Sequence, residues 1–178
     1  MIRIYSLNDL DKIRRNCACI GFFDGVHLGH QELIKKTVEE SKKKNLIPSC
    51  ITFKSSEFSK NNLVSFNRKI ELLSEYGIED IILLPFNEDI KNTTPEDFVS
   101  KYLNNFNIDT LICGFDFTYG YMAKGNINTL RDDKRRNFEV IEVPEFQING
   151  IKVSSTYIRK LLNENDYETA YKLLGHKL

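Results

Sequence analysis

The chain has 178 residues, which is enough for one domain with a sizeable hydrophobic core. Apolar residues make up 41%, charged residues 28% and the formal net charge is zero, which argues against bulk attraction to nucleic acid or to an anionic membrane. No apolar run reaches the roughly 20 residues of a membrane helix, and the first ten residues lack the apolar core of a signal peptide. We therefore expect a cytoplasmic protein without a nucleic-acid or membrane partner.

Apolar runs and amphipathic stretches alternate along the sequence. Buried strands are predicted at 17–23, 46–53, 80–86, 108–114 and 138–143. Helices are predicted at 31–44, 67–76, 94–105, 126–136, 155–163 and 167–174, with a mobile polar loop at 54–65 and a hairpin at 146–153 around Asn149-Gly150. Continuous apolar strands that alternate with helices predict an α/β fold, with a mostly parallel five-stranded sheet and helices on both faces.

The four cysteines, Cys17, Cys19, Cys50 and Cys113, all lie in predicted strands, and no two form a CxxC pair. We expect buried, small hydrophobic side chains rather than disulfides or a zinc site.

The first segment with chemical potential follows the first strand. Asp24-Gly25 ends the apolar run, and two of the chain's three histidines, His27 and His30, follow around Gly29 at a helix start. The free N–H groups and the dipole of that helix favour an anion, most simply a phosphate, and two imidazoles can donate to phosphate oxygens during phosphoryl or nucleotidyl transfer. The alternatives are a metal-ligand pair, which lacks a third histidine and an acidic cluster nearby, and two ordinary surface histidines.

Two further polar segments stand where parallel strands or helices would bring them to the same crevice. Residues 154–159 begin a predicted helix with a serine N-cap, and Thr156 and Arg159 lie one turn apart on its same face. These groups suit a second anion site; the alternative is an ordinary helix cap with a solvated arginine. Residues 114–120 place Asp116 between aromatics and glycines, which suits a sugar or a planar ring; the alternative is a turn with buried aromatics.

Together these segments resemble one family. Residues 21–31, Gly-Phe-Phe-Asp-Gly-Val-His-Leu-Gly-His-Gln, are similar to the HxGH nucleotidyltransferase signature in the form found in prokaryotic FAD synthetases. Gly114-Phe115-Asp116-Phe117, and Ser154-Ser155-Thr156 with Ile158-Arg159, match the second and third motifs of that family in the same order, and the resemblance extends over nearly the whole chain.

The resemblance implies a Rossmann-like nucleotidyltransferase domain over residues 1–178. It also implies transfer of AMP from ATP to FMN, which yields FAD and pyrophosphate, with Mg²⁺ carried on the triphosphate and no metal held by the protein itself. By the same resemblance His27 and His30 are catalytic. The implied ATP-binding residues are Gly21, Phe23, Asp24, Gly25, His27, Gly29, His30, Gly114, Asp116, Ser155, Thr156 and Arg159, and the implied flavin-binding residues are Phe53, Phe117 and Tyr119.

Some positions differ from the family pattern, mainly towards the flavin. Lys54-Ser55 stands where members often carry a proline–histidine motif, Thr118 and Tyr157 stand where arginine is frequent, and Ala123 replaces a basic residue. Two alternatives therefore remain: a nucleotidyltransferase with another phosphorylated acceptor, and a module that binds nucleotide or flavin without turnover. The family's C-terminal riboflavin kinase domain has no counterpart in these residues, so we expect no riboflavin kinase activity.

Overall fold

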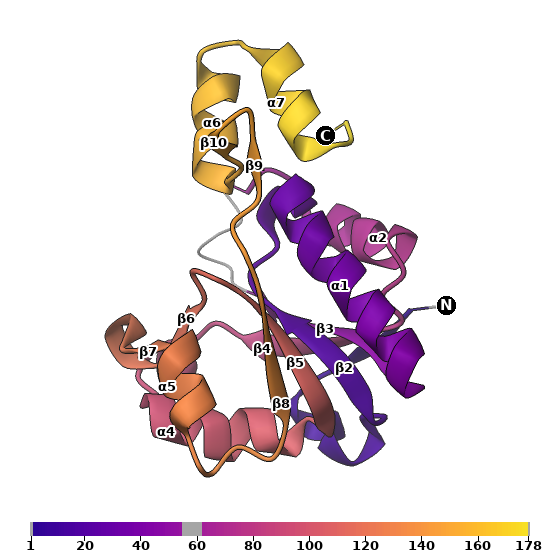
Figure 1. Ribbon diagram of the computed structural model, residues 1–178, viewed down its shortest axis with the longest axis vertical. Coiled ribbons are helices and arrows are strands. Elements are labelled where there is room, and N and C mark those ends of the chain that lie inside the picture. The colour runs from indigo at the N-terminus through magenta and orange to yellow at the C-terminus, as the bar shows by residue number, and fades with distance from the viewer. Residues whose placement is uncertain (1, 55–61, 178) are drawn as a thin grey trace.

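The computed structural model describes residues 2–54 and 62–177, which build up around one central sheet (Figure 1). Six strands lie in the order β1-β4-β3-β2-β5-β8, and every neighbouring pair is parallel. The strands are β1 (Arg3–Tyr5), β2 (Asn16–Ile20), β3 (Ile47–Lys54), β4 (Asp80–Pro85), β5 (Ile108–Gly114) and β8 (Glu139–Val143). The predicted α/β class and parallel sheet are confirmed.

The predicted count of five strands is wrong, because β1 adds a sixth at the edge of the sheet. This strand has only three residues, and the side chains of Arg3 and Ile4 are exposed. Among the described strands it pairs with β4 alone. An edge strand this short carries no apolar run, so its pattern does not distinguish it from a loop.

Helices cover both faces of the sheet, as predicted (Figure 1). On one face α1 (Leu28–Lys44) and α2 (Phe66–Glu75) bury Leu33, Ile34, Leu72 and Leu73 against the strands. The core of the other face includes the helical segment that begins at the Thr94 cap and α5 (Ile127–Asp132). That segment runs through α4 (Pro95–Asp97), a π-helical turn η3 (Phe98–Tyr102) and η4 (Leu103–Asn105).

Short elements connect these layers. They are η1 (Leu7–Lys12), η2 (Asp24–Val26), α3 (Glu88–Lys91), η5 (Tyr121–Ala123) and the two-stranded ribbon of β6 (Thr118–Tyr119) and β7 (Gly125–Asn126). Helix α2 begins at Phe66, and the sequence-based prediction of Asn67 as its cap is wrong, because the Ser65 hydroxyl accepts the Arg68 N–H at 3.2 Å and caps the helix. Most of the loop predicted at 54–65 lies outside the described residues.

The last part of the chain forms a small unit beyond the carboxyl ends of the strands, seen at the top of Figure 1. The hairpin of β9 (Gln147–Ile148) and β10 (Ile151–Lys152) turns at Asn149 and Gly150, both with positive φ. Helices α6 (Ser155–Asn163) and α7 (Tyr167–Leu174) follow with the predicted bounds. They share a separate core that includes Val153, Ile158 and Leu174.

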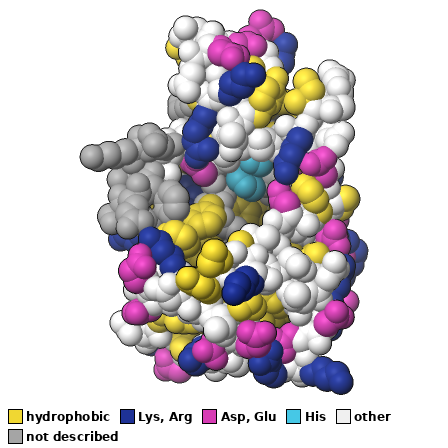
Figure 2. Space-filling model, turned by 90° about the vertical axis from the view of Figure 1, so that its left-hand side faces the viewer, with side chains coloured by type: hydrophobic (Ala, Val, Ile, Leu, Met, Phe, Trp, Pro, Cys, Tyr) yellow, Lys and Arg dark blue, Asp and Glu magenta, His cyan; other side chains and the backbone are white. Residues whose placement is uncertain are grey.

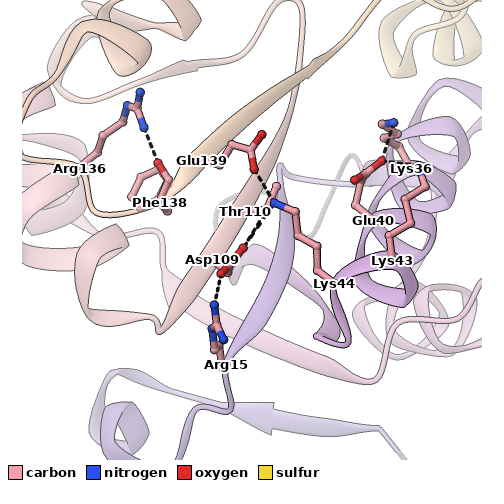
Figure 3. Close-up of polar contacts among 10 residues, drawn as sticks. All are labelled: Arg15, Lys36, Glu40, Lys43, Lys44, Asp109, Thr110, Arg136, Phe138 and Glu139. Atoms are coloured by element: carbon pink, nitrogen blue, oxygen red, sulfur yellow. Dashed lines mark hydrogen bonds and ion pairs between the residues drawn. The ribbon is translucent and has the colours of Figure 1, made fainter.

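The amino-terminal ends of β5 and β8 are tied to the end of α1 by polar contacts (Figure 3). The Lys44 ammonium donates to the Thr110 hydroxyl at 2.7 Å and pairs with Glu139, while Arg15 pairs with Asp109. These charged groups occupy the edge of the sheet opposite to the carboxyl ends of the strands, so they do not occupy the edge where ligands bind in parallel sheets.

All four cysteines are buried and unpaired by disulfides, as expected. Within the described ranges, no helix is both long enough and apolar enough to cross a membrane.

Candidate functional site

The strand order places a crevice between β2 and β5. From β2 the chain proceeds outward through β3 and β4, and from β5 it proceeds the other way to β8. In parallel sheets the connections at such a switch point leave on opposite faces, which opens a crevice beyond the carboxyl ends. A cavity of about 840 Å³ occupies this position, and residues of all three predicted segments line it. Figure 2 shows imidazole atoms in a hollow with apolar side chains beside them.

Left-handed backbone shapes the segment that leaves β2. Phe23, Gly25 and Val26 have φ values of 52°, 77° and 41°. Glycine adopts such values readily, whereas a buried β-branched residue such as Val26 does so only at a cost in conformational energy. This left-handed turn, residues 23–26, lets the chain reverse within four residues from a buried strand to the start of α1.

The carbonyl groups of the left-handed turn are held by side chains from the first turn of α1 and from the segment after α7. Gln31 donates from Nε2 to the Val26 carbonyl at 2.8 Å and to the Leu174 carbonyl at 2.7 Å. His176 Nε2 lies 2.7 Å from the Gly25 carbonyl. These bonds fix the turn against the end of α7, so the carboxy-terminal unit supports the geometry of the site.

His27 and His30 form one stacked pair at the start of α1. Their ring centroids lie 3.7 Å apart at an interplanar angle of 15°. His27 is the N-cap, and its Nδ1 accepts the backbone N–H of His30 at 3.3 Å. A neutral imidazole whose Nδ1 accepts carries its proton on Nε2, so His27 has Nε2–H to offer a ligand. His30 Nδ1 is buried and finds no hydrogen-bond partner among the described residues.

Burial keeps both imidazoles neutral. Desolvation lowers the pKa of His27 to about 4. Desolvation also lowers the pKa of His30 well below its ordinary value, and the neighbouring His27 and Lys69 act in the same direction. Because each ring is neutral at physiological pH, the pair can act as a fixed set of hydrogen-bond donors without a change of charge.

The start of α6 borders the same cavity. Ser154 is the N-cap, because its hydroxyl accepts the Tyr157 N–H at 3.2 Å. The Ser155 hydroxyl donates to the Asp24 carbonyl at 2.9 Å, and Ser155 and Thr156 both line the cavity. The amino-terminal ends of α1 and α6 therefore meet at one end of the cavity, where their dipoles favour an anion.

Three of the predicted nucleotide residues lie behind the starts of α1 and α6 and do not line the cavity: Asp24, Gly25 and Arg159. Arg159 pairs with the Asp24 carboxylate, whose other oxygen accepts the Leu63 N–H at 2.8 Å. An added Cβ on Gly25 would lie 2.7 Å from the Leu63 side chain. These three residues join the left-handed turn to α6 and to the segment before α2.

Gly114 and Asp116 line the cavity at the end of β5. Asp116 is engaged by a residue that the sequence did not indicate: Lys152 of β10 donates to its carboxylate at 2.9 Å and lies 4.6 Å from the centroid of the Phe115 ring. This contact links the hairpin to the loop after β5. A lysine in a surface hairpin gives no signal in the sequence, since nothing local distinguishes it from a solvated charge.

Aromatic side chains line the other end of the cavity. Phe117 and Tyr119 stack there, with their ring centroids 5.5 Å apart. Six residues of the sequence-based predictions line the cavity as a whole: Gly21, Phe23, Gly29, Phe53, Phe117 and Tyr119. Phe22 and Phe86 belong to the same wall and were not predicted: the Phe22 ring lies 4.7 Å from that of Phe53 and 5.1 Å from that of Phe86. We call Phe22, Phe53 and Phe86 the aromatic wall.

The buried histidines make stability depend on pH. An unfolded histidine titrates near 6.5, whereas folded His27 titrates near 4, so below pH 6.5 the unfolded chain binds a proton that the folded chain does not. The free energy of unfolding therefore falls as pH drops from 6.5 towards 4, by about 2 kcal/mol for His27 alone at about pH 5. His27→Asn keeps a capping oxygen but has no imidazole to titrate. Between about pH 7 and about pH 5, we expect its free energy of unfolding, measured by denaturant unfolding, to fall by less than that of wild type. An equal loss in both proteins would contradict this.

Comparison with known proteins places these residues in a family. The sequence profile of the FAD synthetase family matches residues 10–157. A bifunctional riboflavin kinase/FMN adenylyltransferase of Buchnera aphidicola is 38% identical over 97% of this chain and 59% of its own length. A protein of Listeria monocytogenes described as FAD synthetase is 34% identical over 88% of this chain and 67% of its own length. The chain thus spans about three-fifths of the bifunctional relative.

Solved structures agree on the fold. A Streptococcus pneumoniae structure described as a macrolide-efflux protein superposes with a TM-score of 0.87 at 27% identity, over all of this chain and 63% of the other. Pantoate-beta-alanine ligase of Francisella tularensis superposes with a TM-score of 0.64 at 18% identity, over 98% of this chain and 78% of the other, which shows a shared Rossmann-like nucleotidyltransferase fold. The family profile covers the left-handed turn, the histidine pair and the loop after β5, and the chain belongs to the FAD synthetase family.

Proposed function

We propose that this protein is an FMN adenylyltransferase, which transfers AMP from ATP to FMN and releases pyrophosphate. The observation that carries the proposal is the stacked, neutral histidine pair at a cavity bordered by two helix starts. A volume of about 840 Å³ lies within the range typical of small-molecule sites.

In this proposal ATP occupies the polar end of the cavity. The helix starts at Gly29-His30 and Ser155-Thr156 take the phosphates, together with the Nε2–H of His27. The Arg159–Asp24 ion pair supports these two helix starts from behind. The Mg²⁺ that accompanies the triphosphate belongs to the substrate. Gly21, Phe23, Gly25, Gly114 and Asp116 shape the backbone and rim around the nucleotide.

The acceptor occupies the aromatic end. Phe53, Phe117 and Tyr119, with Phe22 and Phe86, offer flat apolar surface of the kind that suits the fused rings of a flavin. A non-aromatic acceptor would leave this surface unused, so the aromatic wall supports FMN over other phosphate esters.

The reaction then proceeds by in-line displacement. A phosphate oxygen of FMN attacks the α-phosphorus of ATP, the bond from that phosphorus to the bridging oxygen breaks, and pyrophosphate leaves with the bonding electrons. Negative charge grows on the oxygens around the α-phosphorus, where His27 and His30 donate hydrogen bonds. No residue needs to form a covalent intermediate, because positioning and charge stabilisation supply the catalysis.

Incubation with Mg-ATP and FMN tests the proposal directly. We expect FAD and pyrophosphate in equal amounts, because one of each forms per transfer. Chromatography separates the flavins and a coupled assay follows pyrophosphate. Pyrophosphate release with another phosphorylated acceptor but not with FMN would point to a different nucleotidyltransferase, and ATP binding without product from any acceptor would point to a binding module.

His30→Ala removes one donor to the transition state. We expect kcat to fall by about 10²–10³ while the KM for ATP changes little, since the donor acts mainly on charge that develops during the reaction. Steady-state kinetics measure both values. Lys35→Ala, at an exposed position of the same helix, is the matched control and should behave as wild type. An unchanged kcat in the His30 variant would remove this residue from the mechanism.

Arg159→Ala leaves the Asp24 carboxylate without its guanidinium beside the phosphate wall. We expect the KM for ATP to rise by about tenfold, because the negative charge of Asp24 next to the helix starts that bind the triphosphate is no longer neutralised. The KM for FMN should change less. Lys160→Ala, one residue along α6 and exposed, serves as the control. A selective loss of FMN affinity would refute this assignment.

A further inference from the structure

One buried cation is not used by the proposed mechanism. Lys69 lies on α2, and only 8% of the residue is exposed. Its ammonium contacts three oxygens, the Phe22 carbonyl at 3.2 Å, the Thr52 hydroxyl at 3.2 Å and the Phe53 carbonyl at 3.4 Å. An ammonium has three protons to donate, so this set of acceptors satisfies it completely.

The three oxygens gather where a strand pair comes apart. β2 ends at Ile20, and the last bond across the pair runs from the Gly21 N–H to the Ile51 carbonyl at 3.1 Å. Alternate residues of a strand face the same edge, so the Phe53 carbonyl points to the side that β2 has left. Lys69 supplies the donor that the missing strand would have given, and it binds the departing Phe22 as well.

The Lys69 ammonium has no close counter-ion in the described part of the chain. No carboxylate of residues 2–54 or 62–177 forms an ion pair with it; the Asp24 charge favours the ammonium from a longer distance, the centroid of the Phe66 ring lies 5.5 Å away, and burial lowers the pKa of Lys69. A buried charge without a close counter-ion costs stability, and an apolar side chain of similar length would cost less. Its contacts therefore point to a role other than stability.

The carbonyl groups that Lys69 holds belong to two residues of the aromatic wall. Phe22 and Phe53 place their rings 4.7 Å apart at an angle of 30°, and both line the cavity. We propose that Lys69 is a positioning residue, whose ammonium locks the ends of β2 and β3 so that Phe22 and Phe53 form a rigid surface for the planar ring of the acceptor. This inference rests on the proposed function, because it concerns the acceptor end of the same cavity.

Lys69→Met tests the inference, because methionine keeps the length of the side chain and removes every donor. We expect the KM for FMN to rise by about tenfold, and the FMN dissociation constant measured by flavin fluorescence to rise equally, because Phe22 and Phe53 are no longer held in a fixed position. The KM for ATP should stay within about twofold. The midpoint of denaturant unfolding should be unchanged or higher, since an apolar residue replaces a buried charge.

Two further variants keep the test decisive. Lys69→Gln retains a neutral donor and should recover part of the FMN affinity, and it also serves if the methionine variant fails to fold. Arg68→Met removes a basic residue of the same helix that pairs with the exposed acids Glu71 and Glu75, and should leave FMN affinity unchanged. Unchanged FMN affinity in both Lys69 variants would overturn the inference, as would an equal loss of ATP and FMN affinity.

Failure of the proposed function would look different from failure of this inference. If wild-type protein forms no FAD, the adenylyltransferase proposal fails, whatever the Lys69 variants do. If wild-type protein forms FAD and Lys69→Met retains wild-type FMN affinity, only the role assigned to Lys69 fails.

Discussion

The site depends on one strained turn and the bonds that hold it. Phe23, Gly25 and Val26 take left-handed backbone conformations, and a buried valine does so only where surrounding contacts compensate. Those contacts come from Gln31 in the first turn of α1 and from His176 near the far end of the chain. With the turn in this shape, α1 begins at the crevice and its first residues present both imidazoles to the cavity. With a relaxed turn, the histidine pair would lose its position.

This constraint explains why a small carboxy-terminal unit accompanies the sheet. Helices α6 and α7 contribute little to the main core, since they bury a separate set of apolar side chains. Their polar contacts go to the turn instead. The Ser155 hydroxyl donates to the Asp24 carbonyl, and the Gln31 amide donates to the carbonyl groups of both Leu174 and Val26. The start of α6 reaches the cavity as a consequence of the same packing. One arrangement thus supports the turn and adds the second helix terminus.

The sequence predicted elements with strong local signals and missed those set by distant contacts. Strand β5 and helices α6 and α7 have their predicted bounds, because apolar runs, a serine cap and Gly175 mark their ends. The edge strand β1 and helix α3, at three and four residues, are too short for a periodic signal. The contact of His176 with Gly25, 151 residues apart, and the tripod of oxygens around Lys69 arise only from the folded topology.

The distribution of charge follows from the same topology. A chain of zero net charge has no bulk attraction for polyanions. The polarity of the cavity is instead local: two helix termini meet there, and the neutral imidazoles donate without adding a charge that would need a counter-ion. Fixed dipoles need little reorganisation when a phosphate changes charge, whereas mobile surface lysines would have to be desolvated and ordered each time. Neutrality of the whole and polarity of the crevice are therefore compatible, because the fold places the positive ends of its dipoles at one point.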